Sequence, residues 1–230
     1  MKIRFILISL LVFLLSCKTT EKTANSEPAV STLKYLALGD SYTIGEMVEA
    51  EGSFPFQLVT AINSKTNFKF APPRIIAKTG WRSDELLKEI KLLEGSYDLV
   101  SVLIGVNNQY QGKDIEKFRT EFKLIVEKAT SLSNKGSKGV FVYSIPNYGV
   151  MPFVRGKNTK KIGKELKEYN SICSEISKQL EVSFYNITEI SEKASFDTKL
   201  IADDKLHPSE FQYKMWVDET VNRIISNQLQ

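Results

Sequence analysis

The feature that most constrains the fold is a regular alternation of short apolar runs with longer amphipathic segments after residue 32. The apolar runs are rich in aliphatic and aromatic residues, as is typical of strands that are buried on both faces of a sheet. We predict strands over residues 33–39, 74–78, 99–104, 140–145 and 182–186. No internal repeat or low-complexity tract interrupts this alternation.

The segments between these strands carry apolar residues three or four positions apart, which is the period of an amphipathic helix. We predict helices over residues 54–64, 83–93, 115–133, 159–180 and about 208–225. Ser83 is a candidate N-cap of the second helix, and Pro208 is a candidate first residue of the last one. Alternating strands and helices predict an α/β fold with a five-stranded parallel sheet covered by helices on both faces.

The first 17 residues have the features of a bacterial export signal. Lys2 and Arg4 form a charged start, and residues 5–15 form an apolar run that is too short to span a bilayer comfortably. The run ends in Leu-Leu-Ser-Cys, which is similar to a bacterial lipobox with Cys17 as the lipidated residue. The alternative is an ordinary cleaved signal that happens to contain a cysteine. We expect a lipoprotein of the bacterial cell envelope that is held on a membrane, on its periplasmic or surface side, through Cys17.

The remaining chain divides into two parts. Residues 18–32 are rich in Lys, Thr, Ser, Glu and Ala without an apolar period, which predicts a flexible tether. Residues 33–230 are long enough for one well-buried domain.

Composition narrows the range of partners and cofactors. The formal net charge of +4 falls to +2 (29 − 27) without residues 1–16, and nothing in this balance implies a nucleic-acid partner. With one histidine and two cysteines, a dedicated zinc site and a disulfide framework are not expected, and we predict no metal and no cofactor. Cys173 lies in a helical pattern, so we expect it to be a small buried hydrophobe.

Chemically suggestive residues follow each predicted strand. Because the carboxyl ends of parallel strands meet at one edge of the sheet, these segments are expected to lie together there. They are Asp40-Ser41, Thr79-Gly80-Trp81, Gly105-Val106-Asn107-Asn108, Pro146-Asn147-Tyr148 and, after a loop, Asp204-Lys205-Leu206-His207.

A serine becomes a strong nucleophile only when a neighbouring base takes its proton. The chain has one histidine, so a serine nucleophile with a histidine base requires His207. Asp204 is placed to hold the imidazole, and Asp203 is a close competitor for that role. The alternative interpretation is a helix cap at Asp40-Ser41 and a solvated histidine in a surface loop.

Taken together, the motifs resemble those of the SGNH/GDSL hydrolase family. The resemblance covers the chain from about Leu33 to Ile225, and it is strongest in Gly-Asp-Ser-x-x-x-Gly from Gly39 to Gly45 and Asp-x-x-His-Pro from Asp204 to Pro208. It implies a flavodoxin-like three-layer α/β/α sandwich.

The resemblance also implies roles for individual residues. Ser41 is the expected nucleophile, with Asp204 and His207 completing the triad, while the backbone N–H groups of Ser41 and Gly80 and the side-chain amide of Asn107 form the oxyanion hole. Asn108 departs from the family pattern, because the third motif usually ends in an aspartate there. An amide donates hydrogen bonds where a carboxylate only accepts them, so this loop must be bonded differently.

The expected activity is hydrolysis of carboxylic esters or thioesters through an acyl-enzyme. One alternative is a carbohydrate O-deacetylase, since aromatic residues near the motifs suit either a sugar platform or an acyl pocket. These residues are Trp81, Tyr110, Tyr148 and Phe153. The other alternative is an inactive surface lipoprotein that binds a ligand in the same pocket.

Overall fold

The computed structural model describes residues 32–230. The predicted signal segment, the proposed lipid-attachment site Cys17 and the tether up to residue 31 therefore lie outside the described residues. Within residues 32–230, no helix is both long and apolar enough to cross a membrane.

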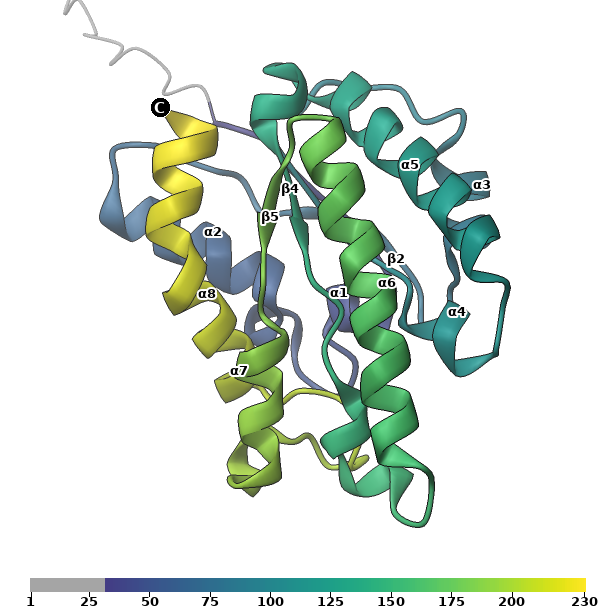
Figure 1. The fold of residues 1–230 in the computed structure, drawn as a ribbon. Coiled ribbons are helices and arrows are strands. Elements are labelled where there is room, and N and C mark those ends of the chain that lie inside the picture. The colour runs from purple at the N-terminus through teal and green to yellow at the C-terminus, as the bar shows by residue number, and fades with distance from the viewer. Residues whose placement is uncertain (1–31) are drawn as a thin grey trace, which may run out of the picture. The chain divides into compact units, whose positions relative to one another are not determined.

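Five strands form a single parallel sheet, as predicted (Figure 1). They are β1 (Tyr35–Gly39), β2 (Arg74–Ala77), β3 (Leu99–Leu103), β4 (Val140–Tyr143) and β5 (Ser183–Tyr185). The strand order is β2-β1-β3-β4-β5, which is the flavodoxin-like order. β1 and β3 are neighbours in register, with Gly39 opposite Leu103, and the direction of winding changes between them. Ligands bind at such a switch point in open α/β sheets.

Helices cover both faces of the sheet and complete the three layers (Figure 1). On one face α2 (Phe54–Lys65) packs against α8 (Glu210–Ile224). On the other face α5 (Ile115–Leu132) packs against both α3 (Ser83–Ile90) and α6 (Thr159–Gln179). The three central strands, β1, β3 and β4, are fully buried between these layers, which explains their continuous apolar sequences. Cys173 of α6 is buried in this core, as expected.

Three short helices fall outside the predicted set, namely α1 (Ser41–Ile44), α4 (Val106–Tyr110) and α7 (Thr188–Glu192). Each is five residues or shorter, so none is long enough to show a helical apolar period. The first two nevertheless begin directly after β1 and β3, at the carboxyl edge of the sheet.

One predicted helix start and one predicted N-cap are wrong. Pro208 precedes the N-cap Ser209 of α8 and pairs with Ile201 in an isolated bridge. Ser83 is the first residue of α3 rather than its cap, since the preceding Arg82 occupies the cap position. The Arg82 N–H donates to the Glu85 carboxylate at 3.0 Å, which leaves the Ser83 hydroxyl free for another partner.

Candidate active site

The turn after β1 holds Ser41 at the first position of α1. The Tyr42 N–H donates to Asp40 Oδ1 at 3.1 Å, so Asp40 is the N-cap of this helix. Gly39 is required here, because a Cβ atom at this position would collide with the Thr43 side chain and the Leu103 carbonyl. Ser41 is thus fixed just beyond the carboxyl end of β1, at the first position of a helix, where backbone N–H groups have no partner within the helix.

The histidine is held by a carboxylate from its own loop. His207 Nδ1 lies 2.5 Å from Asp204 Oδ2, while Asp204 Oδ1 accepts hydrogen bonds from the backbone N–H groups of Leu206 (2.9 Å) and His207 (3.0 Å). Partial burial raises the pKa of Asp204, but the bond to the His207 ring and the two backbone N–H groups outweigh it and leave the pKa below its ordinary value. Asp203 is exposed, so the structure brings Asp204 rather than Asp203 to the ring.

The charge state of Asp204 decides which tautomer of His207 is present. An ionised carboxylate can only accept a hydrogen bond, so Nδ1 must carry the proton and Nε2 is left as an acceptor. Ser41 and His207 line the same pocket, although no hydrogen bond joins their side chains among the described residues. Such bonds often tighten only when substrate is bound.

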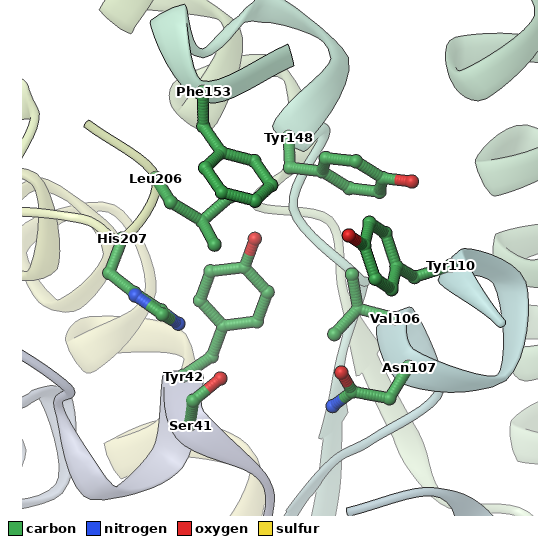
Figure 2. A pocket seen from close by; sticks show the side chains of 9 residues that line it. All are labelled: Ser41, Tyr42, Val106, Asn107, Tyr110, Tyr148, Phe153, Leu206 and His207. Carbon is green, nitrogen blue, oxygen red and sulfur yellow. The ribbon is translucent and has the colours of Figure 1, made fainter. Parts of the chain in front are cut away.

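Asn107 is held beside the pocket by a hydrogen bond from its amide nitrogen to the Trp81 carbonyl, 3.0 Å away. The amide has a second N–H, and Figure 2 shows the amide end of the Asn107 side chain directed toward Ser41. Asn107 therefore links the loop after β3 to the loop after β2 and keeps one donor for a ligand.

Asn108 turns away from the pocket into a buried polar network. Its Oδ1 accepts from the Ser83 N–H at 3.0 Å, and its amide donates to the Ser83 hydroxyl at 2.7 Å. That hydroxyl in turn donates to the Glu121 carboxylate at 2.6 Å. All three side chains are buried, so each bond replaces one that water would otherwise make. The network explains why an amide stands at position 108, since Glu121 already accepts the only proton that Ser83 can give.

Gly80 lies in the loop after β2, with a positive φ of 82° that favours glycine. The neighbouring Thr79 hydroxyl donates to the Glu46 carboxylate, which ties this loop to the segment that follows α1. Gly80 is not among the residues that line the pocket, so of the three proposed oxyanion donors only Ser41 and Asn107 lie directly on it.

A cavity of about 140 Å³ opens above Ser41, and Figure 2 shows its walls. His207 and Asn107 stand on opposite sides of Ser41, and aromatic side chains form the part farther from the serine. The lining residues are Ser41, Tyr42, Val106, Asn107, Tyr110, Tyr148, Phe153, Leu206 and His207. The structure therefore brings Ser41, Asn107 and His207 together, as the sequence motifs predicted.

The predicted aromatic set needs one correction. Tyr110, Tyr148 and Phe153 line the cavity, but Trp81 does not, because its side chain packs against the core. Tyr42, Val106 and Leu206 take part instead. These three residues are unspecified positions (x) within the motifs. Their closeness in sequence to the motif residues is the only sequence signal that could have predicted their place in the pocket.

Tyr148 is anchored through a polar chain behind the pocket. Its hydroxyl donates to Gln109 Oε1 at 2.8 Å, and the Gln109 amide donates to Glu165 at 2.7 Å. Burial raises the pKa of Tyr148 to about 12, although the bond with Gln109 opposes this. The Tyr148 side chain is therefore held in place and uncharged, and it forms one wall of the pocket.

Residues 32–230 contain no group of three or more His, Cys, Asp or Glu side chains that could hold a metal ion. The chemistry available at the described site consists of a serine hydroxyl, an imidazole held by a carboxylate, and amide donors. This is the side-chain set of a serine hydrolase on a parallel α/β fold.

Comparison with known families agrees with this class. The sequence model of the GDSL-like Lipase/Acylhydrolase family matches residues 37–215, so the chain belongs to this family of ester hydrolases. A search of curated proteins found no match.

Several solved structures share the fold. The psychrotrophic esterase EstA from Pseudoalteromonas sp. is 17% identical, with a TM-score of 0.59 over 84% of this chain and 97% of that one. Axe2, an acetylxylan esterase from Geobacillus stearothermophilus, is 16% identical, with a TM-score of 0.62 over 85% and 95% of the two chains. AlinE4, described as an SGNH-hydrolase family esterase, is 20% identical, with a TM-score of 0.58 over 85% and 96%.

Proposed function

We propose that the protein hydrolyses carboxylic esters through a covalent acyl-enzyme formed on Ser41. The observation that carries the proposal is the Asp204–His207 pair, which leaves Nε2 as a proton acceptor in the pocket that also holds Ser41. An acceptor nitrogen beside a serine is what activates the hydroxyl.

In the first step Ser41 Oγ bonds to the carbonyl carbon while His207 Nε2 takes the hydroxyl proton. The carbonyl oxygen becomes an oxyanion, and Asp204 stabilises the imidazolium that forms. Collapse of the tetrahedral intermediate breaks the bond to the alkoxide, which leaves with the proton from His207. Water then attacks the acyl-enzyme, His207 takes its proton, and the acid and free Ser41 are released.

The oxyanion is proposed to bind the backbone N–H groups of Ser41 and Gly80 and the free amide N–H of Asn107. These donors lie on three loops that the structure ties together through the bond of Asn107 to the Trp81 carbonyl and that of Thr79 to Glu46. Donors that need no reorganisation stabilise a developing charge well, and loss of one costs a factor of about 10²–10³ in rate.

The size of the cavity favours short acyl groups. A dry protein cavity of about 150 Å³ holds a molecule the size of benzene. The cavity above Ser41 has about 140 Å³ and mainly apolar walls, so it accommodates acyl chains from acetyl to about pentanoyl. Longer chains would extend past the aromatic side chains into solvent.

A panel of p-nitrophenyl esters with acyl chains from acetyl to dodecanoyl tests this activity on the full-length protein. We expect kcat/KM to peak among the short esters and to be lost in Ser41→Ala. A fluorophosphonate probe should label Ser41 in the wild type and leave Ser41→Ala unlabelled. Labelling of another serine would overturn the assignment of the nucleophile, and a wild type without turnover or labelling would favour an inactive ligand-binding protein.

A carbohydrate O-deacetylase is the second candidate. It is favoured by the small cavity and by the exposed rings of Tyr110 and Phe153, on which a sugar could stack. Axe2, which has the same fold, is an acetylxylan esterase. Release of acetate from acetylated xylo-oligosaccharides, measured beside p-nitrophenyl acetate, separates the two candidates, because a deacetylase should have the higher kcat/KM on the sugar.

We also propose that the protein is anchored to a bacterial membrane by lipid on Cys17, on the periplasmic or surface side. The support is the sequence of residues 1–17 alone. The wild type should partition into the detergent phase, whereas Cys17→Ser should do so less. Equal partitioning of the two forms would contradict the anchor.

A further inference from the structure

The opening of the pocket is formed by two exposed aromatic rings with a lysine across them. Tyr110 is 50% exposed and Phe153 is 44% exposed, and both line the cavity. Lys157 Nζ lies 5.0 Å from the Tyr110 ring centre and 5.2 Å from that of Phe153. An ammonium at such distances is attracted by the negative faces of both rings. Two rings from separate segments, Tyr110 at the end of α4 and Phe153 in the turn of residues 152–154, therefore hold the Lys157 charge beside the opening of the pocket.

The chain around Lys157 is strongly cationic. Residues 155–161 contain Arg155, Lys157, Lys160 and Lys161, all exposed, and no carboxylate. The loop that carries the histidine adds the exposed Lys205, whose carbonyl accepts the Phe153 N–H at 3.0 Å. The two loops are therefore in contact at the opening.

Few carboxylates balance these charges. Lys161 pairs with Glu165 at 3.6 Å, but in the part of the chain that the structure describes no carboxylate lies within 4 Å of Lys157, Arg155 or Lys205. Asp203, in the loop of Lys205, is exposed, and Asp204 is engaged by His207. The opening thus carries an excess of positive charge, while the cavity walls below it are mainly apolar.

We propose that Lys157 and its neighbouring cations bind an anionic group on the ester substrate, in the part of the substrate that stays outside the cavity. The proposal rests on the proposed ester hydrolysis and narrows its substrates to esters that carry a carboxylate, phosphate or sulfate. Cations within reach of a bound anion favour the charged substrate over a neutral one of equal size. Such an anion can belong to a soluble acidic ester or to the headgroup of an anionic lipid.

A matched pair of acetate esters tests the proposal on the full-length protein. 4-Acetoxybenzoate is anionic, whereas 4-acetoxybenzamide has the same shape and no charge. The quantity measured is the ratio of kcat/KM for the anionic ester to kcat/KM for the neutral one. Because variants are compared through this ratio, the different leaving groups of the two esters cancel, as does any general loss of activity.

We expect the ratio to fall about threefold to tenfold in Lys157→Glu and by less in Lys157→Gln, as befits exposed charges in contact with an anion. Lys138→Glu makes the same charge change at an exposed site beside the start of β4, at the opposite edge of the sheet, and should leave the ratio unchanged. Raising the salt concentration should lower the wild-type ratio and affect Lys157→Glu less, because salt screens exposed charges.

Three outcomes are decisive. A ratio that is equal in Lys157→Glu and Lys138→Glu, in an enzyme that still hydrolyses the neutral ester, overturns this proposal alone. A wild type that hydrolyses neither ester and is not labelled at Ser41 overturns the proposed function, and the proposal falls with it. Inhibition of neutral-ester hydrolysis by phosphatidylglycerol vesicles but not phosphatidylcholine vesicles, lost in Lys157→Glu, supports the proposal and identifies a lipid headgroup as the source of the anion.

Discussion

Two aspartates flank the proposed reaction centre, and they differ in burial, in hydrogen bonding and in the direction of their pKa shifts. Asp40 precedes Ser41 in the turn after β1 and is fully buried, with Oδ1 accepting one N–H bond and Oδ2 without a partner among the described residues. Asp204 is partly exposed, and its two oxygens accept three bonds. Burial raises the pKa of Asp40 to about 7, against the lowering effect of backbone N–H groups. The pKa of Asp204 instead lies below its ordinary value.

This difference shows that distance along the chain from the nucleophile does not decide which carboxylate can do chemistry. A carboxylate that supports an imidazolium must be ionised, and ionisation requires donors or solvent. Asp204 is partly exposed and accepts three hydrogen bonds, while Asp40 is fully buried and accepts one, from the Tyr42 N–H. The turn after β1 therefore fixes the position of Ser41, and the loop of residues 203–207 supplies the negative charge that supports His207.

The largest expected effect comes from removing the charge of Asp204. Asp204→Asn keeps an oxygen for the Leu206 and His207 N–H groups, so the loop should retain its shape. The new amide donates toward Nδ1 and moves the ring proton to Nε2, which can then no longer accept from Ser41. We expect kcat/KM for p-nitrophenyl acetate to fall about 10⁴-fold, as when the acid of a serine triad is neutralised.

Asp203→Asn is the matched control, since it makes the same change in the neighbouring exposed residue. Its kcat/KM should stay within about twofold of the wild type, as for most surface substitutions. If Asp203→Asn abolished activity and Asp204→Asn had little effect, the roles assigned to the two residues would have to be exchanged. The assignment of the protein as a hydrolase would be unaffected.

A smaller effect is expected at a second buried carboxyl, that of Glu121, when Asn108 is made acidic. Asn108→Asp replaces the amide that donates to Ser83 with a second acceptor, so two carboxylates compete for one hydroxyl proton. We expect a loss of about 2–3 kcal/mol in the free energy of unfolding, typical of a buried polar group left unpaired, measured by urea unfolding. The adjoining Asn107 should shift as well, which lowers kcat about tenfold.

The double variant Asn108→Asp/Glu121→Gln provides the control. The glutamine amide can donate to the Ser83 hydroxyl, which can then donate to the aspartate, so every group in the chain of bonds is again satisfied. Glu121→Gln alone should be mild, because its oxygen still accepts from Ser83. Failure of the double variant to regain stability and kcat would mean that the polarity of this network does not position the loop.

Much of this fold could be predicted from the sequence. All five strands and the five long helices follow from apolar runs and helical periods, because burial on one or both faces leaves a pattern in the chain itself. The placement of Ser41, Asn107 and His207 at one edge of the sheet could also be predicted, because the carboxyl ends of parallel strands meet at one edge. Residue types and topology together carry that information.

Other features depend on contacts between distant segments, which leave no local pattern. Ser83 matched the sequence preference for an N-cap, yet its hydroxyl serves Glu121, 38 residues away. Trp81 matched the composition of a ligand platform but packs against the core. The choice between Asp203 and Asp204 is a matter of loop geometry, because both are acidic and adjacent. The sequence shows which groups are available, and tertiary packing decides which of them meet.

The smallest expected effect tests the other member of the comparison, Asp40. Its raised pKa means that the folded protein holds this proton up to about pH 7, while the unfolded chain loses it near the ordinary value of 3.8. Between these values the folded state binds more protons, so the free energy of unfolding falls as the pH rises. From pH 6 to pH 8 the wild type should lose about 1.4 kcal/mol relative to Asp40→Asn, which does not titrate.

Asp40→Asn keeps the oxygen that accepts the Tyr42 N–H, so the cap of α1 and the position of Ser41 should survive. The Tm of the wild type minus that of Asp40→Asn should therefore decrease by about 3–6 °C between pH 6 and pH 8. Other titrating groups contribute equally to both proteins and cancel in this difference. A difference in Tm that does not change between pH 6 and pH 8 would contradict a pKa of about 7 for Asp40.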